Sequence, residues 1–166
     1  MLIRAAEVDE YADVGALTLE AYRVDGHLDG VDDYGDELAD AARRAAEASL
    51  LVAVDESSGR LLGTVTYCCH GTPYAEVSHP GEAEFRMLAV APAARGTGVG
   101  RALVQACVAR ARTEGRSALA LCSLESMRPA HRIYERMGFR RAPDRDWEPE
   151  PGIVLIGYVL PLAGGS

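Results

Sequence analysis

Apolar and polar residues alternate along this chain in short blocks whose period switches between that of a strand and that of a helix. Six blocks are typical of strands, because apolar or β-branched residues run through them between turn residues. These predicted strands cover residues 2–5, 50–54, 61–67, 84–90, 118–122 and 153–160. Four blocks repeat apolar residues at helical spacing. They are a first helix carrying Val8, Val14, Leu17 and Ala21, and helices over 37–48, 99–113 and 129–137. The pattern predicts a mixed α/β fold.

The order of three of these elements predicts how two strands pair. Strand 84–90, helix 99–113 and strand 118–122 form a βαβ unit. Because such a crossover returns the chain in the same direction, the two strands are expected to be parallel.

A glycine-rich run separates the first strand of this unit from its helix. It reads Arg-Gly-Thr-Gly-Val-Gly-Arg-Ala over 95–102. Glycines let backbone N–H groups approach an oxyanion closely, and the helix that follows adds the positive end of its dipole. A P-loop is excluded because the chain contains no lysine, and a dinucleotide fingerprint would need a third glycine where Arg101 stands. The run therefore predicts a phosphate cradle of another kind.

Two motifs together resemble the GNAT superfamily of N-acetyltransferases. The first is Phe-Arg-Met-Leu-Ala-Val-Ala-Pro-Ala-Ala-Arg-Gly-Thr-Gly-Val-Gly over 85–100, and the second is Ala-His-Arg-Ile-Tyr-Glu-Arg-Met-Gly-Phe over 130–139. The resemblance covers roughly residues 2–160, with its specific part within 84–139. It implies a single domain over 1–166, with a mixed sheet of six or seven strands, about four helices and a splayed pair of parallel strands.

The same resemblance implies acetyl-CoA as the donor. The strand backbone bonds the pantetheine arm, and the glycine-rich turn holds the pyrophosphate. The implied donor-binding residues are Leu88, Ala89, Val90, Arg95, Gly96, Thr97, Gly98, Val99, Gly100, Arg101, Ser126 and Tyr134. One position departs from the family, because Met127 stands where an asparagine often contacts CoA. Ser123 and Ser126 lie nearby in the sequence.

For catalysis, Tyr134 matches the family tyrosine that protonates the departing thiolate. A tyrosine at this helical position is otherwise a core residue. Glu84 matches the strand glutamate that some members use as a base. Alternatively, Glu84 forms an ion pair with Arg86 or lies at the solvent-exposed start of the strand. Glu82 and His79 are rival bases, and many members need no dedicated base.

The residues that bind the acceptor amine are predicted from an acidic segment and from one aromatic residue. Acidic residues crowd 25–37, and Asp29, Asp32 and Asp33 among them are candidates for a wall that attracts a cationic amine. The alternative is a solvated surface loop. Trp147, the single tryptophan, either contacts the acceptor or anchors its own loop.

Composition narrows the remaining classes of function. A net charge of −8 disfavours nucleic-acid binding. No 18-residue apolar run or signal peptide is recognised, so a cytoplasmic protein without a membrane span is expected. The four cysteines lack metal-ligand spacing, and no metal is expected. The absence of lysine and the many alanines suggest a GC-rich bacterial genome, and the apolar final strand ending at Pro161 is compatible with a homodimer.

Two function classes stay open at this point. The first is an N-acetyltransferase that moves an acetyl group from acetyl-CoA to the primary amine of a small molecule, an amino acid or a peptide. The second is a non-catalytic acyl-CoA-binding module that uses the same cradle.

Overall fold

The chain divides into two compact units. The computed structural model describes residues 1–28 and 34–162. The first unit contains residues 1–67 and 87–106, and the second contains 68–86 and the chain from 107 onward. Three elements run from one unit into the other: strands β3 (Leu61–Cys69) and β4 (Ala83–Val90) and helix α4 (Val99–Thr113).

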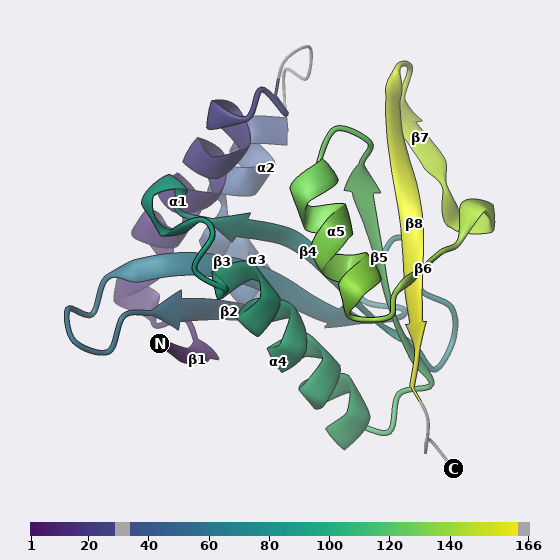
Figure 1. Ribbon diagram of the computed structural model, residues 1–166, viewed down its shortest axis with the longest axis horizontal. Helices are drawn as coiled ribbons and strands as arrows, with labels where there is room; N and C mark the ends of the chain where they lie inside the picture. Colours follow the sequence, from purple (N-terminus) through teal and green to yellow (C-terminus); the bar gives the residue numbers. More distant parts are fainter. Residues whose placement is uncertain (29–33, 163–166) are drawn as a thin grey trace. The chain divides into compact units, whose positions relative to one another are not determined.

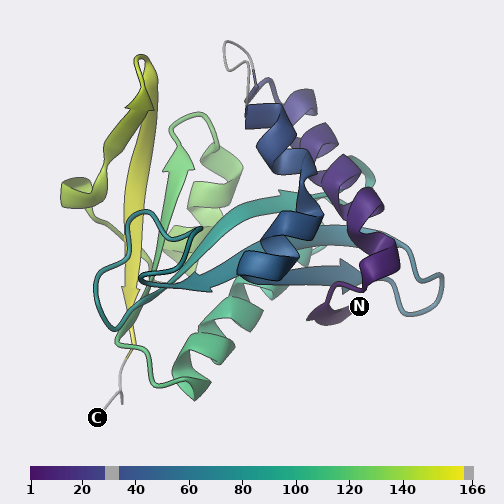
Figure 2. The same ribbon diagram turned by 180° about the vertical axis from the view of Figure 1, so that it is seen from behind.

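The first unit is a sheet with helices on both faces (Figures 1 and 2). Strands β1 (Leu2–Ala5), β2 (Ser49–Val54) and β3 pair antiparallel, and the end of β4 follows β3 in strand order. On one face lie α1 (Tyr11–Val24), α2 (Tyr34–Ala39) and α3 (Ala41–Glu47), and on the other the first turns of α4. Strands β2 and β3, which follow each other in the chain, form a hairpin.

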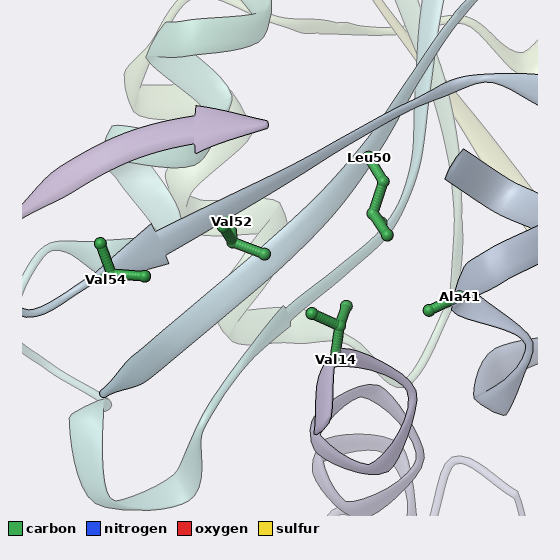
Figure 3. Close-up of a cluster of buried hydrophobic side chains, with 5 residues drawn as sticks. All are labelled: Val14, Ala41, Leu50, Val52 and Val54. Carbon is green, nitrogen blue, oxygen red and sulfur yellow. The ribbon is translucent and has the colours of Figure 1, made fainter. Parts of the chain in front are cut away.

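Alternation along β2 builds the core beneath these helices. Leu50, Val52 and Val54 point to one face of the strand, where they meet Val14 of α1 and Ala41 of α3 (Figure 3). Because successive strand residues face opposite sides, the apolar residues of a single strand fill one layer.

The predicted helix over 37–48 is wrong in one respect, because the chain forms two helices there. Asp40 adopts a non-helical conformation between α2 and α3. Its carboxylate accepts a hydrogen bond from the N–H of Arg43 at 3.1 Å, so it caps α3. The uninterrupted alanine-rich composition hid this break, since an aspartate within a helical pattern is equally compatible with an exposed face.

The second unit joins parallel and antiparallel strands. Strand β5 (Ala118–Leu124) pairs parallel with the start of β4 and antiparallel with β8 (Ile153–Pro161). Both β6 (Arg140–Arg141) and β7 (Trp147–Glu150) add to β8, and helix α5 (Arg128–Arg136) lies beside β5 (Figure 1). The predicted parallel pair and mixed α/β fold are confirmed.

Strands β6 and β7 were not predicted from the sequence. The first has only two residues, and the second contains Pro149 between charged neighbours. All their residues are exposed, so neither strand carries the apolar alternation that marks a half-buried strand. Within the described residues, no helix is long and apolar enough to cross a membrane.

Candidate functional site

The glycine-rich turn of the first unit connects the end of β4 with the start of α4. Pro92 opens a short 3-10 turn over Pro92–Ala94, which suits its fixed φ. Gly96 and Gly98 then adopt φ values of 76° and 87°, which residues with a side chain rarely adopt. The carbonyl of Gly98 accepts the hydrogen bond of the Ala102 N–H at 3.0 Å, so the helix begins immediately after this glycine.

The space above these glycines is open. A Cβ atom built on Gly96 or Gly98 would meet no atom within 4 Å among the described residues. The N–H groups of the first turn of a helix have no carbonyl partner within the helix, and they lie at the positive end of its dipole. An open backbone concavity at such a helix start fits a diphosphate, as in the CoA chain.

Arg95, at the start of the turn, is held by the first helix of the same unit. Its guanidinium forms an ion pair with Asp25 at 2.6 Å and donates to the carbonyl of Ala21 at 3.3 Å. Both charged side chains are about a third exposed, so the pair contributes at most about 1 kcal/mol. The sequence did not predict this contact, because the two charges are 70 residues apart.

Strand β4 has an irregularity at its centre. Met87 has a φ of 55°, and it is the single non-glycine residue with positive φ in the part of the chain that the structure describes. Such a conformation interrupts strand pairing and is costly for a residue with a side chain. The parallel ladder with β5 joins Ala83 with Leu119 and Glu84 with Ala120, before Met87. Leu88, Ala89 and Val90 follow it.

The other end of this strand is fixed within the first unit. The N–H of Ala91 donates to the carbonyl of Leu62 on β3 at 2.8 Å. Gly63 lies so close to the neighbouring strand that a Cβ there would be 2.8 Å from the carbonyl oxygen of Ala89. The end of β4 is therefore fixed to β3 by a hydrogen bond, and the lack of a side chain at Gly63 allows the two backbones to lie close together.

Glu84 is fully buried and its carboxylate holds a loop. Its two oxygens accept from the N–H groups of Glu76, Val77 and Ser78 at 2.9–3.0 Å. The alternatives of a wet strand start or a pair with Arg86 are not what the structure shows, since Arg86 forms its ion pair with Glu76 instead. The role of Glu84 as a base stays a prediction.

The two rival bases lie on the same loop. Glu82 forms a largely buried ion pair with Arg145, with distances of 2.5 and 3.0 Å. Burial alone would raise the pKa of Glu82, but the hydrogen bond and charge of Arg145, together with the N–H of His79, lower that pKa overall. The side chain of His79 itself is exposed.

Tyr134 lies in the middle of an aromatic cluster of the second unit. Its ring packs at centroid distances of 5.7–6.4 Å against the rings of Phe85, Phe139, Tyr158 and His131. Burial raises the pKa of the Tyr134 hydroxyl, so the phenol is protonated at neutral pH. The predicted end of its helix is confirmed, because Gly138 has a φ of 96° and the N–H of Phe139 bonds the Tyr134 carbonyl.

The start of this helix carries the position that departs from the family. Met127 is the residue before the first turn of α5, and its sulfur lies 3.5 Å from the Ser123 hydroxyl. The same hydroxyl is 3.0 Å from Nε2 of His131, and both side chains are buried. Ser126 lies in the connecting turn, where its carbonyl accepts from the N–H of Arg128.

Of the acceptor candidates, one lies within the described residues. Trp147 is on β7 and 38% exposed, and burial raises the pKa of the Cys122 thiol on β5. Asp29, Asp32 and Asp33 lie outside the described residues.

The profile of the acetyltransferase (GNAT) family matches residues 13–139 of the sequence. The chain belongs to the GNAT acetyltransferase family. The prediction from the two motifs is confirmed, and with it the class of enzyme, since acetyl-CoA is the co-substrate of this family.

Individual relatives support the same assignment. An uncharacterized N-acetyltransferase of Schizosaccharomyces pombe is 29% identical over 90% of this chain and 86% of its own length. The mycothiol acetyltransferase of Pseudarthrobacter chlorophenolicus is 37% identical over 62% of this chain, but the match spans about a third of that enzyme, 32%. A GCN5-related N-acetyltransferase from Kribbella flavida has a TM-score of 0.71 and 27% identity, with 97% of each chain covered.

Proposed function

We propose that this protein is an N-acetyltransferase that moves the acetyl group of acetyl-CoA to the primary amine of a small molecule, an amino acid or a peptide. The amine attacks the thioester directly while both substrates are bound. The observation that carries the proposal is the open glycine turn at the start of α4, directly after the interrupted strand β4. Because the family profile spans residues of both units, we further propose that they form one acetyltransferase domain over 1–166.

On the donor side, the N–H groups of the turn and of the first helical turn hold the diphosphate. The pantetheine arm pairs with the strand edge that follows Met87, as an added strand would. The proposed donor residues are Leu88, Ala89, Val90, Arg95, Gly96, Thr97, Gly98, Val99, Gly100, Arg101, Ser126 and Tyr134. This proposal is supported by the positive φ values of Gly96 and Gly98 and by the open space above them.

The chemistry needs an uncharged amine, a polarised carbonyl and a proton for the leaving thiolate. A backbone N–H at the end of β4, that of Val90, polarises the carbonyl. Tyr134 gives its proton to the sulfur as the C–S bond breaks. Burial raises the pKa of its hydroxyl, so the proton is on the oxygen at neutral pH and is available to the leaving sulfur.

On the acceptor side, we propose that the exposed Trp147 and the acidic segment with Asp29, Asp32 and Asp33 contact the amine substrate. Opposite charge attracts a cationic amine over a distance of about 8 Å at physiological salt. The preference for cationic acceptors is therefore expected to weaken as the salt concentration rises.

The decisive experiment mixes the purified protein and acetyl-CoA with a panel of amines and measures free CoA by chromatography. The panel contains polyamines, amino acids, amino-acid amides and short peptides. We expect CoA release with at least one amine, and an acetylated product of matching mass. Binding of acetyl-CoA in calorimetry without release for any amine would instead indicate the non-catalytic module.

A further inference from the structure

The reaction proposed above leaves one proton without a defined destination. When the amine nitrogen attacks the thioester it gains positive charge, and one N–H bond must then break to give the amide. The carboxylates that the sequence offers as bases already hold protein groups. Glu84 accepts hydrogen bonds from three backbone N–H groups, and Glu82 is paired with Arg145. Protonation of either carboxylate would weaken bonds that hold the loop.

A second pair of titratable and hydroxyl groups lies beside Tyr134. Ser123, near the end of β5, and His131, in α5, are 5% and 8% exposed, and 3.0 Å separates the hydroxyl oxygen from Nε2. His131 precedes Tyr134 by three residues, so both side chains leave the same face of the helix. Their ring centroids are 6.4 Å apart with an angle of 36° between the ring planes.

The ring nitrogen is the nearest partner of the Ser123 hydroxyl. The carbonyl of Leu124 and the sulfur of Met127 lie at 3.4 and 3.5 Å, which are weak contacts for a hydroxyl donor. A serine hydroxyl that donates to a histidine nitrogen keeps its own lone pairs for another donor. An attacking amine is such a donor.

We infer that Ser123 and His131 form the relay that removes the proton from the attacking amine, an inference that rests on the proposed function. The N–C bond forms while an amine proton passes to the Ser123 oxygen and the hydroxyl proton passes to Nε2 of His131. The C–S bond breaks and the thiolate takes the proton of Tyr134. The proton on His131 then returns to the Tyr134 oxygen through solvent, so the products are the amide and free CoA.

The surroundings of the ring favour its neutral, proton-accepting form. Burial lowers the pKa of His131, and the Leu124 backbone carbonyl and the Glu135 carboxylate offset this in part. The cations facing the ring are Arg128 on the same helix and Arg141 on β6, and both lower that pKa further. On β8, the ring of Tyr158 packs at 5.5 Å and adds no charge while its phenol is protonated.

The test compares substitutions that keep or remove each function. Gln at position 131 can hold a hydrogen bond to Ser123 but cannot take up a proton, so His131→Gln separates positioning from proton transfer. We expect His131→Gln to lower kcat with the best amine of the panel by about 10²-fold. Ser123→Ala should lower it similarly, and Ser123→Thr, which keeps a hydroxyl, should recover most of the rate. The exposed His70→Gln is the matched control and should leave kcat unchanged.

The pH profile gives a readout that packing alone would not move. Below the pKa of the amine, log(kcat/KM) of the wild type should rise with pH with slope one. Below the pKa of His131, which lies under its ordinary value of about 6.5, the slope should be two, because both groups must lose a proton. In His131→Gln the slope should stay at one. A kcat within threefold of wild type together with an unchanged slope of two would overturn the relay.

An NMR measurement on the wild-type protein does not depend on activity. Nitrogen-15 spectra at neutral pH should show His131 neutral, with Nε2 unprotonated and accepting the serine hydroxyl. A protonated Nε2 would overturn the relay even if all variants failed to fold. If no amine of the panel is acetylated while this tautomer is observed, the proposed function fails and the hydrogen-bond assignment stands.

Discussion

The glycine turn of the first unit and the aromatic cluster of the second unit differ in which groups they present and in how much space surrounds them. The turn offers backbone N–H groups at Gly96 and Gly98 and leaves the space above them open. The cluster offers the side chain of Tyr134, and rings from β4, α5 and β8 and that of Phe139, three residues beyond α5, fill the space around it. The first suits a bulky anion that must enter and leave, and the second suits a proton whose affinity is tuned by burial.

This difference predicts how each region responds to substitution. In the turn, an added side chain should weaken acetyl-CoA binding because it fills the open space. In the cluster, loss of the Tyr134 hydroxyl should lower kcat because the acidic proton is lost, while the ring contacts keep the fold.

The largest effect is expected for Gly98→Val. A branched side chain at a φ of 87° strains the backbone and projects into the space where the diphosphate binds. Loss of two charge-assisted hydrogen bonds of about 1.5–3 kcal/mol each corresponds to roughly 10²- to 10⁴-fold weaker acetyl-CoA binding. Calorimetry of acetyl-CoA binding measures this change in affinity.

The matched control for Gly98→Val is Gly59→Val in the turn between β2 and β3. Gly59 also has positive φ, 72°, and open space around a built Cβ, so it carries the same backbone strain without a ligand. We expect similar losses of stability in both variants but unchanged CoA affinity in Gly59→Val. Equal affinities would show that the glycine turn is not the donor site.

Tyr134→Phe tests the other side of the contrast. The ring contacts remain while the acidic proton is lost, so kcat should fall by about 10²- to 10⁴-fold with little change in acetyl-CoA affinity. Steady-state kinetics and calorimetry measure the two quantities. Tyr158→Phe removes a hydroxyl from the same ring cluster and should leave kcat within a few-fold. A Tyr134→Phe enzyme as fast as this control would make Tyr134 a packing residue.

The substitution Glu84→Gln tests whether the buried carboxylate of Glu84 stabilises the fold or acts as the catalytic base. Its amide has a single acceptor oxygen for the three N–H donors of the loop, and its NH₂ group would face donors. We expect a loss of about 2–4 kcal/mol in the free energy of unfolding, measured by urea denaturation. The exposed Glu125→Gln is the control and should be neutral. Unchanged stability with a flattened pH-rate profile would instead support Glu84 as the base.

The smallest effect is expected for the Arg95–Asp25 pair. If Arg95 contacts the diphosphate when CoA binds, Arg95→Ala should weaken acetyl-CoA binding by about tenfold. Asp25→Asn releases the guanidinium and should change the affinity by less than threefold. Equal losses in both variants, with no further loss in the double variant, would show that Arg95 acts by holding α1 rather than by binding phosphate.

The conformation of the glycine turn could be predicted from the sequence, because it is a property of the backbone. Glycines at fixed spacing before a helix imply positive φ and free N–H groups wherever they occur. The C-terminal end of α5 was predicted from local sequence in the same way, because Gly138 adopts a positive φ that stops the helix. The central strands were predicted because apolar residues must run through a buried strand.

The tertiary structure alone decided which polar side chains meet. Nothing local tells that the N–H groups of residues 76–78 converge on Glu84, that Arg95 pairs with Asp25, or that His131 lies 3.0 Å from Ser123. Such contacts depend on how distant segments pack, and many packings satisfy one hydrophobic pattern. The sequence by itself determined the family, through its two motifs, and the parallel pairing of the βαβ unit. It also determined the glycine conformations of the turn, because these follow from short-range backbone geometry. Packing decided which titratable side chains are buried and which partners they have, and burial and partners in turn set their pKa values.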